Sequence, residues 1–432
     1  MHLLRGAVAS LVCCAAVLTM QPPMADASDS ATPTSSRGPS TYIVREGVTL
    51  NSPLGTSETK RAILDKILGA IRHTRPGGTL KIMTWNFNSP EAVTALLGAQ
   101  DRGVVVRVLM DANNNDEDTD NPVWRRLRAG LKANNPRNAT FAEKSVAKTC
   151  QGSCRGGGGA SHAKFFLFPR VGNFEKVLIQ GSANLTTAAA ANQWNEIFTY
   201  VGRAQIYDFA EAVFDEMWLD KPVPGPFRSF DSGKYGLVFS PLKGSDYVLD
   251  PVQDTLNKVR CYGAVDAGNE RGRTIVRSAP DVIRGQRGMT AARRLKELWD
   301  GGCDVRLVYT VIGKDVKRYL SQQTGRGPLP MRHLVQDFNG DGDFDNYFHL
   351  KVLTVNGVIG KNTTAYYAIN GSSNTSDGST TSDENIGTFE SKPITLRYED
   401  FINYWFDNPP ADGTSSERHA PVADPYVNVD LD

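Results

Sequence analysis

The sequence has almost no net charge and no long apolar segment after its first residues. Its 432 residues contain 48 Lys+Arg against 47 Asp+Glu, which gives a formal net charge of +1. Unspecific binding to phosphate backbones needs a clustered excess of basic side chains, so this balance disfavours a nucleic-acid partner. No later stretch approaches the roughly 20 apolar residues of a membrane helix. We expect a soluble globular protein long enough for two domains.

Cysteine is also scarce, and two of the six lie in an N-terminal segment unlike the rest. Arg5 precedes an apolar run over residues 7–20, and a small-x-small site follows at 25–27. This order predicts a secretory signal peptide and a secreted, extracellular protein. A lipoprotein anchor on Cys13 or Cys14 is disfavoured, because neither follows a small-residue cleavage site.

Secretion leaves four cysteines in an oxidising compartment, where three pairings are open to them. Glycines around Cys150 and Cys154, in KTCQGSCRGGGG, allow a tight loop between these two. Cys261 and Cys303 then form the second pair. The alternative, a metal site built on C-x3-C, lacks a second ligand pair nearby and suits a cytosolic protein better. We predict two structural disulfides.

Helical and strand patterns alternate, and their order occurs twice. The patterns predict helices at 57–73 and 90–100 with strands at 80–85 and 104–110, then helices at 249–259 and 290–299 with strands at 274–277 and 305–310. The phrases DRGVVVRVLMD and DGGCDVRLVYT align at an offset of 199 residues, Gly103 against Gly302. The sequence therefore predicts an α/β protein of two similar halves, each a mixed sheet flanked by helices.

Composition suggests where these halves begin and end. The expected organisation is a signal peptide at 1–27, a disordered lead-in at 28–40, a first half at 41–220, a proline- and glycine-rich linker at 221–234, a second half at 235–406 and an extended tail at 407–432.

The strongest functional signal is a motif that recurs in both halves. SHAKFFLFP, IQGSANLT and NQWNEIF in the first half correspond to FHLKVLTVN, INGSSNTS and SDENIGT in the second. His and Lys two residues apart lie on one face of a strand. Gly-Ser-x-Asn follows the His by 19 or 22 residues, and an acid stands 12 or 10 residues after that Asn. One such motif is weak evidence, whereas two in a duplicated frame indicate an active site.

This constellation resembles the phospholipase D superfamily, whose motif is H-x-K-x4-D followed by G-S-x-N. The resemblance implies two halves about a pseudo-twofold axis, one active site between them, and a phosphodiesterase that works through a phosphohistidine without a catalytic cofactor. By similarity His162 is the nucleophile and His349 the general acid.

The other motif residues fit that chemistry. Lys164 and Lys351 supply positive charge to the developing phosphorane. The uncharged side chains suited to hydrogen-bond phosphate oxygens are Ser182, Asn184, Ser372 and Asn374. Glu196 and Glu384 are expected each to hold an imidazole in the required tautomer.

Two positions depart from the family motif. The Asp expected five residues after each Lys is replaced by Pro169 and by Asn356. The departures put in doubt whatever structural contact that Asp makes, and they leave open a non-catalytic protein that only binds phosphate or lipid. The inferred catalytic His and Lys residues are unaffected.

An acidic segment, DFNGDGDFDNYFH, precedes the second His. It matches the first nine positions of a calcium loop, with oxygen ligands at Asp337, Asn339, Asp341, Asp343 and Asp345. Phe348 occupies the position of the usual twelfth-residue Glu. Two interpretations stay open for this segment: a solvated acidic loop and a structural calcium site.

Taken together, the sequence predicts a secreted phospholipase D-like enzyme that releases or exchanges phospholipid head groups, with transient membrane-surface contact. A secreted nuclease using the same site is the first alternative, which the neutral charge disfavours. We expect the chain to act as a monomer.

Overall fold

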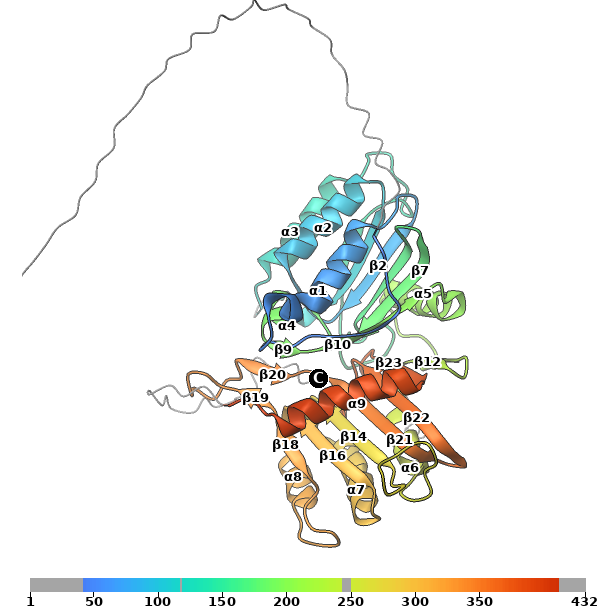
Figure 1. Cartoon of the computed structure of the whole chain (residues 1–432). Coiled ribbons are helices and arrows are strands. Elements are labelled where there is room, and N and C mark those ends of the chain that lie inside the picture. The colour runs from blue at the N-terminus through green and yellow to red at the C-terminus, as the bar shows by residue number, and fades with distance from the viewer. Residues whose placement is uncertain (1–41, 117–118, 243–249, 412–432) are drawn as a thin grey trace, which may run out of the picture. The chain divides into compact units, whose positions relative to one another are not determined.

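The computed structural model describes residues 42–116, 119–242 and 250–411, in which two large mixed sheets carry helices on both faces (Figure 1). The segments expected to be a signal peptide at 1–27 and a lead-in at 28–40 lie outside the described residues, as does most of the tail expected from 407. The predicted class, two similar α/β halves, is confirmed.

The first sheet has the order β1-β10-β7-β6-β2-β4-β5. Its strands are β1 (Gly47–Leu50), β2 (Thr79–Thr84), β4 (Val105–Asp111), β5 (Val146–Cys150), β6 (Phe165–Val171), β7 (Phe174–Gly181) and β10 (Glu196–Val201). The central strands β2 and β4 run parallel, and most of their residues are buried, as expected for strands covered on both faces.

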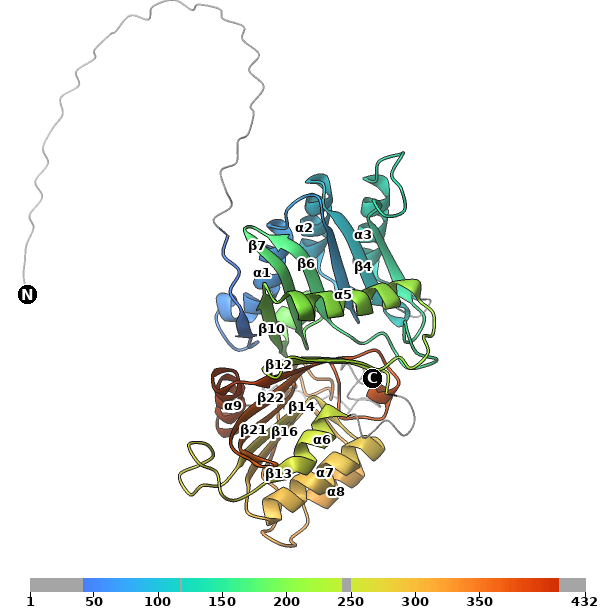
Figure 2. The same ribbon diagram turned by 90° about the vertical axis from the view of Figure 1, so that its right-hand side faces the viewer.

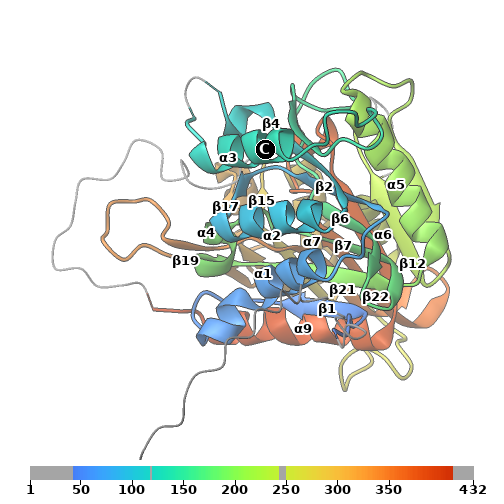
Figure 3. The same cartoon turned by 90° about the horizontal axis from the view of Figure 1, so that it is seen from above.

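Helices cover both faces of this sheet. They are α1 (Ser57–Arg72), α2 (Pro90–Asp101), α3 (Pro122–Ala133), α4 (Thr187–Ala191) and α5 (Ala204–Leu219). Figure 3 shows α1 and α2 from above, and Figure 2 shows α5 across the opposite face. Ser89 and Asn121 cap α2 and α3, each followed by a proline that is tolerated in the first turn.

The second sheet has the order β11-β12-β23-β22-β21-β14-β16-β18, with β13 paired to β21. Its strands are β11 (Arg228–Asp231), β12 (Tyr235–Phe239), β13 (Val259–Arg260), β14 (Ile275–Pro280), β16 (Asp304–Tyr309), β18 (Met331–His333), β21 (Lys351–Ile359), β22 (Asn362–Gly371) and β23 (Asn385–Glu390). Its helices are α6 (Pro251–Lys258), α7 (Gly285–Asp300), α8 (Lys314–Leu320) and α9 (Lys392–Asp407).

Shorter strands complete the fold. They are β3 (Phe87–Asn88) paired with β8 (Leu185–Thr186), β15 (Val282–Ile283) paired with β17 (Val311–Ile312), and β9 (Gln193–Trp194), β19 (Val335–Gln336) and β20 (Asn346–Phe348) in one sheet. The β9–β20 pair joins the halves directly, with Trp194 opposite Phe348. No helix in the described part of the chain is long and apolar enough to cross a membrane.

The register of the central strands confirms the predicted duplication. Thr79 pairs with Val105 in the first half, and Ile275 pairs with Asp304 in the second. Val105 and Asp304 follow the predicted Gly103–Gly302 alignment, at an offset of 199 residues, and Thr79 and Ile275 are related by an offset of 196. The residue that follows each strand, Trp85 after β2 and Asp281 after β14, therefore occupies the same place in the two halves.

The expected linker contains a strand, and one predicted helix boundary was wrong. The linker expected at 221–234 contains β11, because Phe230 packs on Phe209 of α5 and the segment can pair with β12. The helix expected at 290–299 begins at Gly285, since Asp377 accepts hydrogen bonds from the backbone N–H groups of Gln286 and Arg287. That contact joins segments far apart in sequence.

Three large apolar clusters hold the layers together. One lies between the first sheet and helices α1 to α3, another between the second sheet and helices α6 to α8, and the third includes α5, α9 and residues of both sheets. Phe198 of β10 and Phe389 of β23 meet in the third cluster with ring centroids 4.6 Å apart. The inner faces of the halves thus share one core.

A polar network crosses this shared core. Gln180 donates to Asn370 (2.8 Å) and accepts from Asn385 (2.8 Å), while Asn370 and Tyr398 donate to Glu196 (2.5 and 2.8 Å). Burial raises the pKa of Glu196 to about 7, although these donors oppose the shift. The halves are therefore joined through a carboxyl group that is costly to ionise.

Both predicted disulfides, Cys150–Cys154 and Cys261–Cys303, are present in the structure. The first closes a small loop before His162, and the second ties the end of β13 to the start of β16 across 42 residues of sequence. The loops differ in length, so we expect the bonds to differ in their effect on stability.

Replacing both Cys261 and Cys303 by Ala should lower the free energy of unfolding by about 4 kcal/mol, because the longer loop loses more entropy on closure. The same change at Cys150 and Cys154 should cost about 2 kcal/mol. Urea unfolding of both variants measures the difference. Equal losses would contradict the loop-entropy account.

Glu196→Gln should stabilise the protein at alkaline pH. The pKa of the folded carboxyl is about 7 and its ordinary value is 4.5, so its favourable contribution is complete below pH 4.5 and disappears as pH rises through 7. The variant should gain up to about 3 kcal/mol at pH 8 and little at pH 4. Thermal melts across this range, with the exposed Glu58→Gln as control, test the sign. A variant less stable than the parent at pH 8 would refute it.

Candidate active site

The two motif histidines lie at equivalent places beside the central strands. His162 precedes β6, and His349 stands between β20 and β21. The residue before each is held by the end of the neighbouring parallel strand: Asp111 accepts from the Ser161 N–H (2.7 Å), and the Thr310 hydroxyl donates to the Phe348 carbonyl (2.9 Å). The carboxyl ends of the parallel strands therefore position both histidines, and sequence reasoning missed Asp111 and Thr310.

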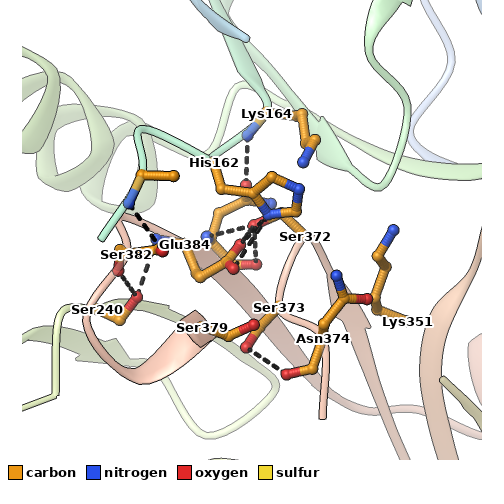
Figure 4. A network of polar contacts seen from close by, with 12 residues as sticks. His162, Lys164, Ser240, Lys351, Ser372, Ser373, Asn374, Ser379, Ser382 and Glu384 are labelled. Carbon is orange, nitrogen blue, oxygen red and sulfur yellow. Dashed lines mark hydrogen bonds and ion pairs between the residues drawn. The ribbon is translucent and has the colours of Figure 1, made fainter. Parts of the chain in front are cut away.

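Each imidazole is held at Nδ1 by a residue of the other half. His162 Nδ1 lies 2.9 and 3.0 Å from the two carboxylate oxygens of Glu384 (Figure 4). His349 Nδ1 lies 2.7 Å from Oδ1 of Asn195. The reciprocal contacts place both motif copies at the boundary between the halves.

Glu384 is ionised in this arrangement. Burial alone would raise its pKa, but the charges of His162 and Lys164 and hydrogen bonds from His162 and Ser372 lower it below the ordinary value. A carboxylate at Nδ1 keeps the hydrogen on that nitrogen and leaves Nε2 as the reactive atom. Figure 4 shows the opposite edge of the His162 ring facing the Lys164 amine.

The role expected for Glu196 was wrong. Asn195, not Glu196, contacts His349, and Glu196 points into the polar network of the shared core. Glu196 and Asn385 each begin a strand and donate their N–H to the motif serine of their half, so they are equivalent. Asn195 therefore corresponds to Glu384. The unequal spacing from serine to acid, 14 against 12 residues, was a signal that the two acids do not correspond.

The serine hydroxyls support the residues that hold the histidines. Ser182 donates to Oδ1 of Asn195 (2.9 Å), and the Ser372 hydroxyl donates to Glu384. The phosphate contact expected of these serines stays a prediction. Asn184 accepts from the Asn86 N–H (3.3 Å). Figure 4 shows Asn374 beside Lys351.

The surroundings of the histidines are unlike each other. In the first half Trp85 packs edge-on to His162, with ring centroids 5.7 Å apart, and lies 5.8 Å from the Lys164 amine. In the second half Asp281, the equivalent residue, places Oδ2 3.2 Å from the Lys351 amine and 3.8 Å from His349 Nε2. All motif His and Lys side chains are buried. Neither Trp85 nor Asp281 was singled out from the sequence, where each is a single residue after a strand.

The loop closed by Cys150–Cys154 connects the halves next to Glu384. Asp383 accepts from the Ser153 hydroxyl (2.9 Å) and the Cys154 N–H (2.5 Å), and it pairs with the buried Arg155 (3.4 Å). Arg155 also donates to the carbonyl oxygens of Pro226 and Ser240. The disulfide loop therefore fixes the chain direction into both His162 and Glu384.

The two residues that replace the family Asp have different surroundings. Asn356 accepts from the Gly268 N–H (2.7 Å) and donates to Glu399 of α9 (3.2 Å), so it still ties its strand to neighbouring segments. Pro169 lies on β6 against Gly78, where a Cβ on the glycine would approach it to 2.5 Å. Neither residue contributes to the histidine network described above.

The acidic loop before His349 is folded on itself. Asp337 accepts from the Gly340 and Gly342 N–H groups, and Asp345 accepts from the Phe338 N–H. In the described part of the chain, the one group of three acidic, His or Cys ligands close enough to hold a metal is Cys150, Cys154 and Asp220, and its cysteines form a disulfide. The structural calcium stays a prediction.

Comparisons with known proteins give a domain match for part of the chain and a similar fold for most of it. The family model described as "Cardiolipin synthase, PLD-like domain" matches residues 67–218, which include His162 and exclude His349. No curated protein matches the chain.

Two solved structures resemble the chain over most of its length. Phosphatidylserine synthase from Haemophilus influenzae Rd KW20 has 11% identity and a TM-score of 0.56, covering 84% of this chain and 89% of its own. Polyphosphate kinase from Porphyromonas gingivalis has 11% identity and a TM-score of 0.54 over 87% of this chain. The chain spans about half of that kinase, 53%. At such identity the likeness establishes the fold alone. The family match shows a PLD-like domain at residues 67–218, about a third of the chain.

Proposed function

We propose that the protein is a phospholipase D-like phosphodiesterase that hydrolyses or exchanges phospholipid head groups through a phosphohistidine on His162. The observation that carries the proposal is the reciprocal contact of each histidine with the other half, His162 with Glu384 and His349 with Asn195. Two histidines held at Nδ1 with Nε2 directed elsewhere suit a nucleophile and an acid that act in turn.

The chemical steps follow from these positions. His162 Nε2 attacks phosphorus, the bond from phosphorus to the head-group oxygen breaks, and His349 gives that oxygen its Nε2 proton. Water or another alcohol then attacks the phosphohistidine, returns a proton to His349 and releases phosphatidate or an exchanged lipid. Lys164 and Lys351 balance negative charge on the phosphoryl oxygens in both steps.

A lipid substrate is favoured over nucleic acid by two observations. The chain has a net charge of +1 and hence no overall excess of basic residues for a phosphate backbone. The matching family model is described by the name of a lipid enzyme, cardiolipin synthase. We further propose secretion, which the two disulfides support because such bonds persist in oxidising compartments.

The purified protein should release choline or ethanolamine from mixed phospholipid vesicles, and His162→Ala or His349→Ala should each reduce the rate by at least about 100-fold. His73→Ala is the matched control, because His73 sits at the end of α1, stacked on Tyr42. A parallel digest of DNA and RNA identifies the nuclease alternative. Inactivity on lipid and nucleic acid would instead indicate a binding protein.

The two histidines should respond differently to a leaving group that needs no proton. With a p-nitrophenyl phosphodiester, His349→Ala should still release one equivalent of p-nitrophenol in a burst, because His162 can attack without acid assistance. His162→Ala should give no burst. Stopped-flow absorbance and the intact mass of the quenched protein measure both outcomes. A burst from His162→Ala alone would reverse the assigned roles.

A further inference from the structure

The proton that His349 transfers can reside on only one atom. Asn195 Nδ2 donates to the Ala189 carbonyl (3.2 Å) and to Gln193 Oε1 (3.0 Å), which fixes the orientation of its amide. Its Oδ1 therefore faces His349 and accepts the Nδ1 hydrogen at 2.7 Å. Because Nδ1 keeps its hydrogen, Nε2 is the position that gains or loses a proton.

Asp281 is the acid next to that position. Its Oδ2 lies 3.8 Å from His349 Nε2, and both side chains are fully buried. The Asp281 main chain is fixed as well, since its carbonyl accepts from the N–H groups of Thr310 (3.0 Å) and Val311 (2.8 Å). A negative charge at this distance in a dry site favours the protonated imidazole.

Other charged and titratable groups also lie near His349. Lys351 of β21 places its amine 3.2 Å from Asp281, and it opposes a positive imidazole. Tyr347 of β20 packs edge-on, with ring centroids 5.7 Å apart. The first half contributes Asn195, which is neutral, so Asp281 is the negative group among these neighbours.

His162 has the opposite arrangement. The carboxylate next to His162 is that of Glu384, and it contacts Nδ1. There it stabilises the positive charge that the ring gains when Nε2 attacks phosphorus. The place equivalent to Asp281 is occupied by Trp85, which carries no charge. The carbonyl of Trp85 accepts from the N–H of Asp111, the last residue of β4 (3.3 Å), and that of Asp281 from Thr310, just after β16 (3.0 Å). The two positions therefore correspond.

From this asymmetry we propose that Asp281 is a positioning residue that keeps a proton on Nε2 of His349 and thereby makes His349 the general acid. The inference rests on the proposed function for its catalytic meaning, but the proton itself can be observed without a substrate. A carboxylate at Nδ1 suits the nucleophile, and a carboxylate at Nε2 suits the acid.

The first test is nitrogen NMR of histidine-labelled protein, with signals assigned from His162→Ala and His349→Ala. At pH 7 the wild-type His349 should carry hydrogen on both nitrogens, and His162 on Nδ1 alone. Asp281→Asn should lower the midpoint of the His349 titration by roughly one pH unit. Asp281→Glu, which restores the charge, should recover part of the shift.

Asp304→Asn is the matched control. It removes one carboxylate from the start of β16, roughly 20 Å along the strand from Thr310, and should leave the His349 titration unchanged. A His349 titration that is the same in Asp281→Asn and wild type would overturn the proposal. If Asp281→Asn does not fold, an unprotonated His349 Nε2 in the wild-type protein at pH 7 overturns it.

The second test is the pH dependence of kcat/KM. A general acid acts while protonated, so a lower His349 pKa should move the alkaline limb for a choline lipid down by roughly one pH unit in Asp281→Asn. The alkaline limb of the pH profile for the p-nitrophenol burst should stay at the same pH in Asp281→Asn. If the alkaline limb of kcat/KM for the choline lipid lies at the same pH in Asp281→Asn and in the wild type, the inference is contradicted. If the wild type cleaves no diester, the proposed function fails, and the NMR titration still decides the role of Asp281.

Discussion

The His162 imidazole is bound by a carboxylate that lies 222 residues away in sequence and in the other half of the chain. Neither group is suited to burial alone, because a buried charge is unfavourable unless it is paired and hydrogen-bonded. The site therefore exists only where the two halves meet. The shared aromatic core, the β9–β20 pair and the Cys150–Cys154 loop all act to hold Glu384 at His162.

Duplication explains why the two histidines have equivalent positions, and differences between the halves explain why their chemical surroundings differ. Equivalent strands place equivalent residues around each histidine. The motif Lys, Ser and Asn are the same in both halves, whereas three other pairs differ: Asn195 against Glu384, Trp85 against Asp281, and Asp111 against Thr310. Two identical sites would compete for the same role. Different partners at Nδ1 and Nε2 allow one imidazole to attack while the other transfers a proton.

The contact between the halves uses polar groups where apolar ones would be more stable. Glu196 is buried beside Asn370 and Tyr398, and its pKa is raised to about 7. Arg155 is also fully buried, where Asp383 and several carbonyl groups compensate its charge. Such groups tolerate only one relative placement of the halves, because any shift leaves a buried donor or acceptor unpaired. That requirement keeps each histidine in contact with its partner in the other half.

The sequence alone determined the fold class, the duplication, both disulfides and the positions of the two His-x-Lys motifs, because each depends on local periodicity or on spacing within a motif. It did not determine that Asn195 rather than Glu196 holds His349, since the choice depends on which residue begins β10. Asp281 and Trp85 were also beyond reach, because a single residue after a strand has no local signal. Tertiary structure decided these points. Hydrogen-bond geometry across the two packed halves selects which residue contacts each nitrogen of a histidine, and the spacing of residues in the sequence carries no information about distances between the halves.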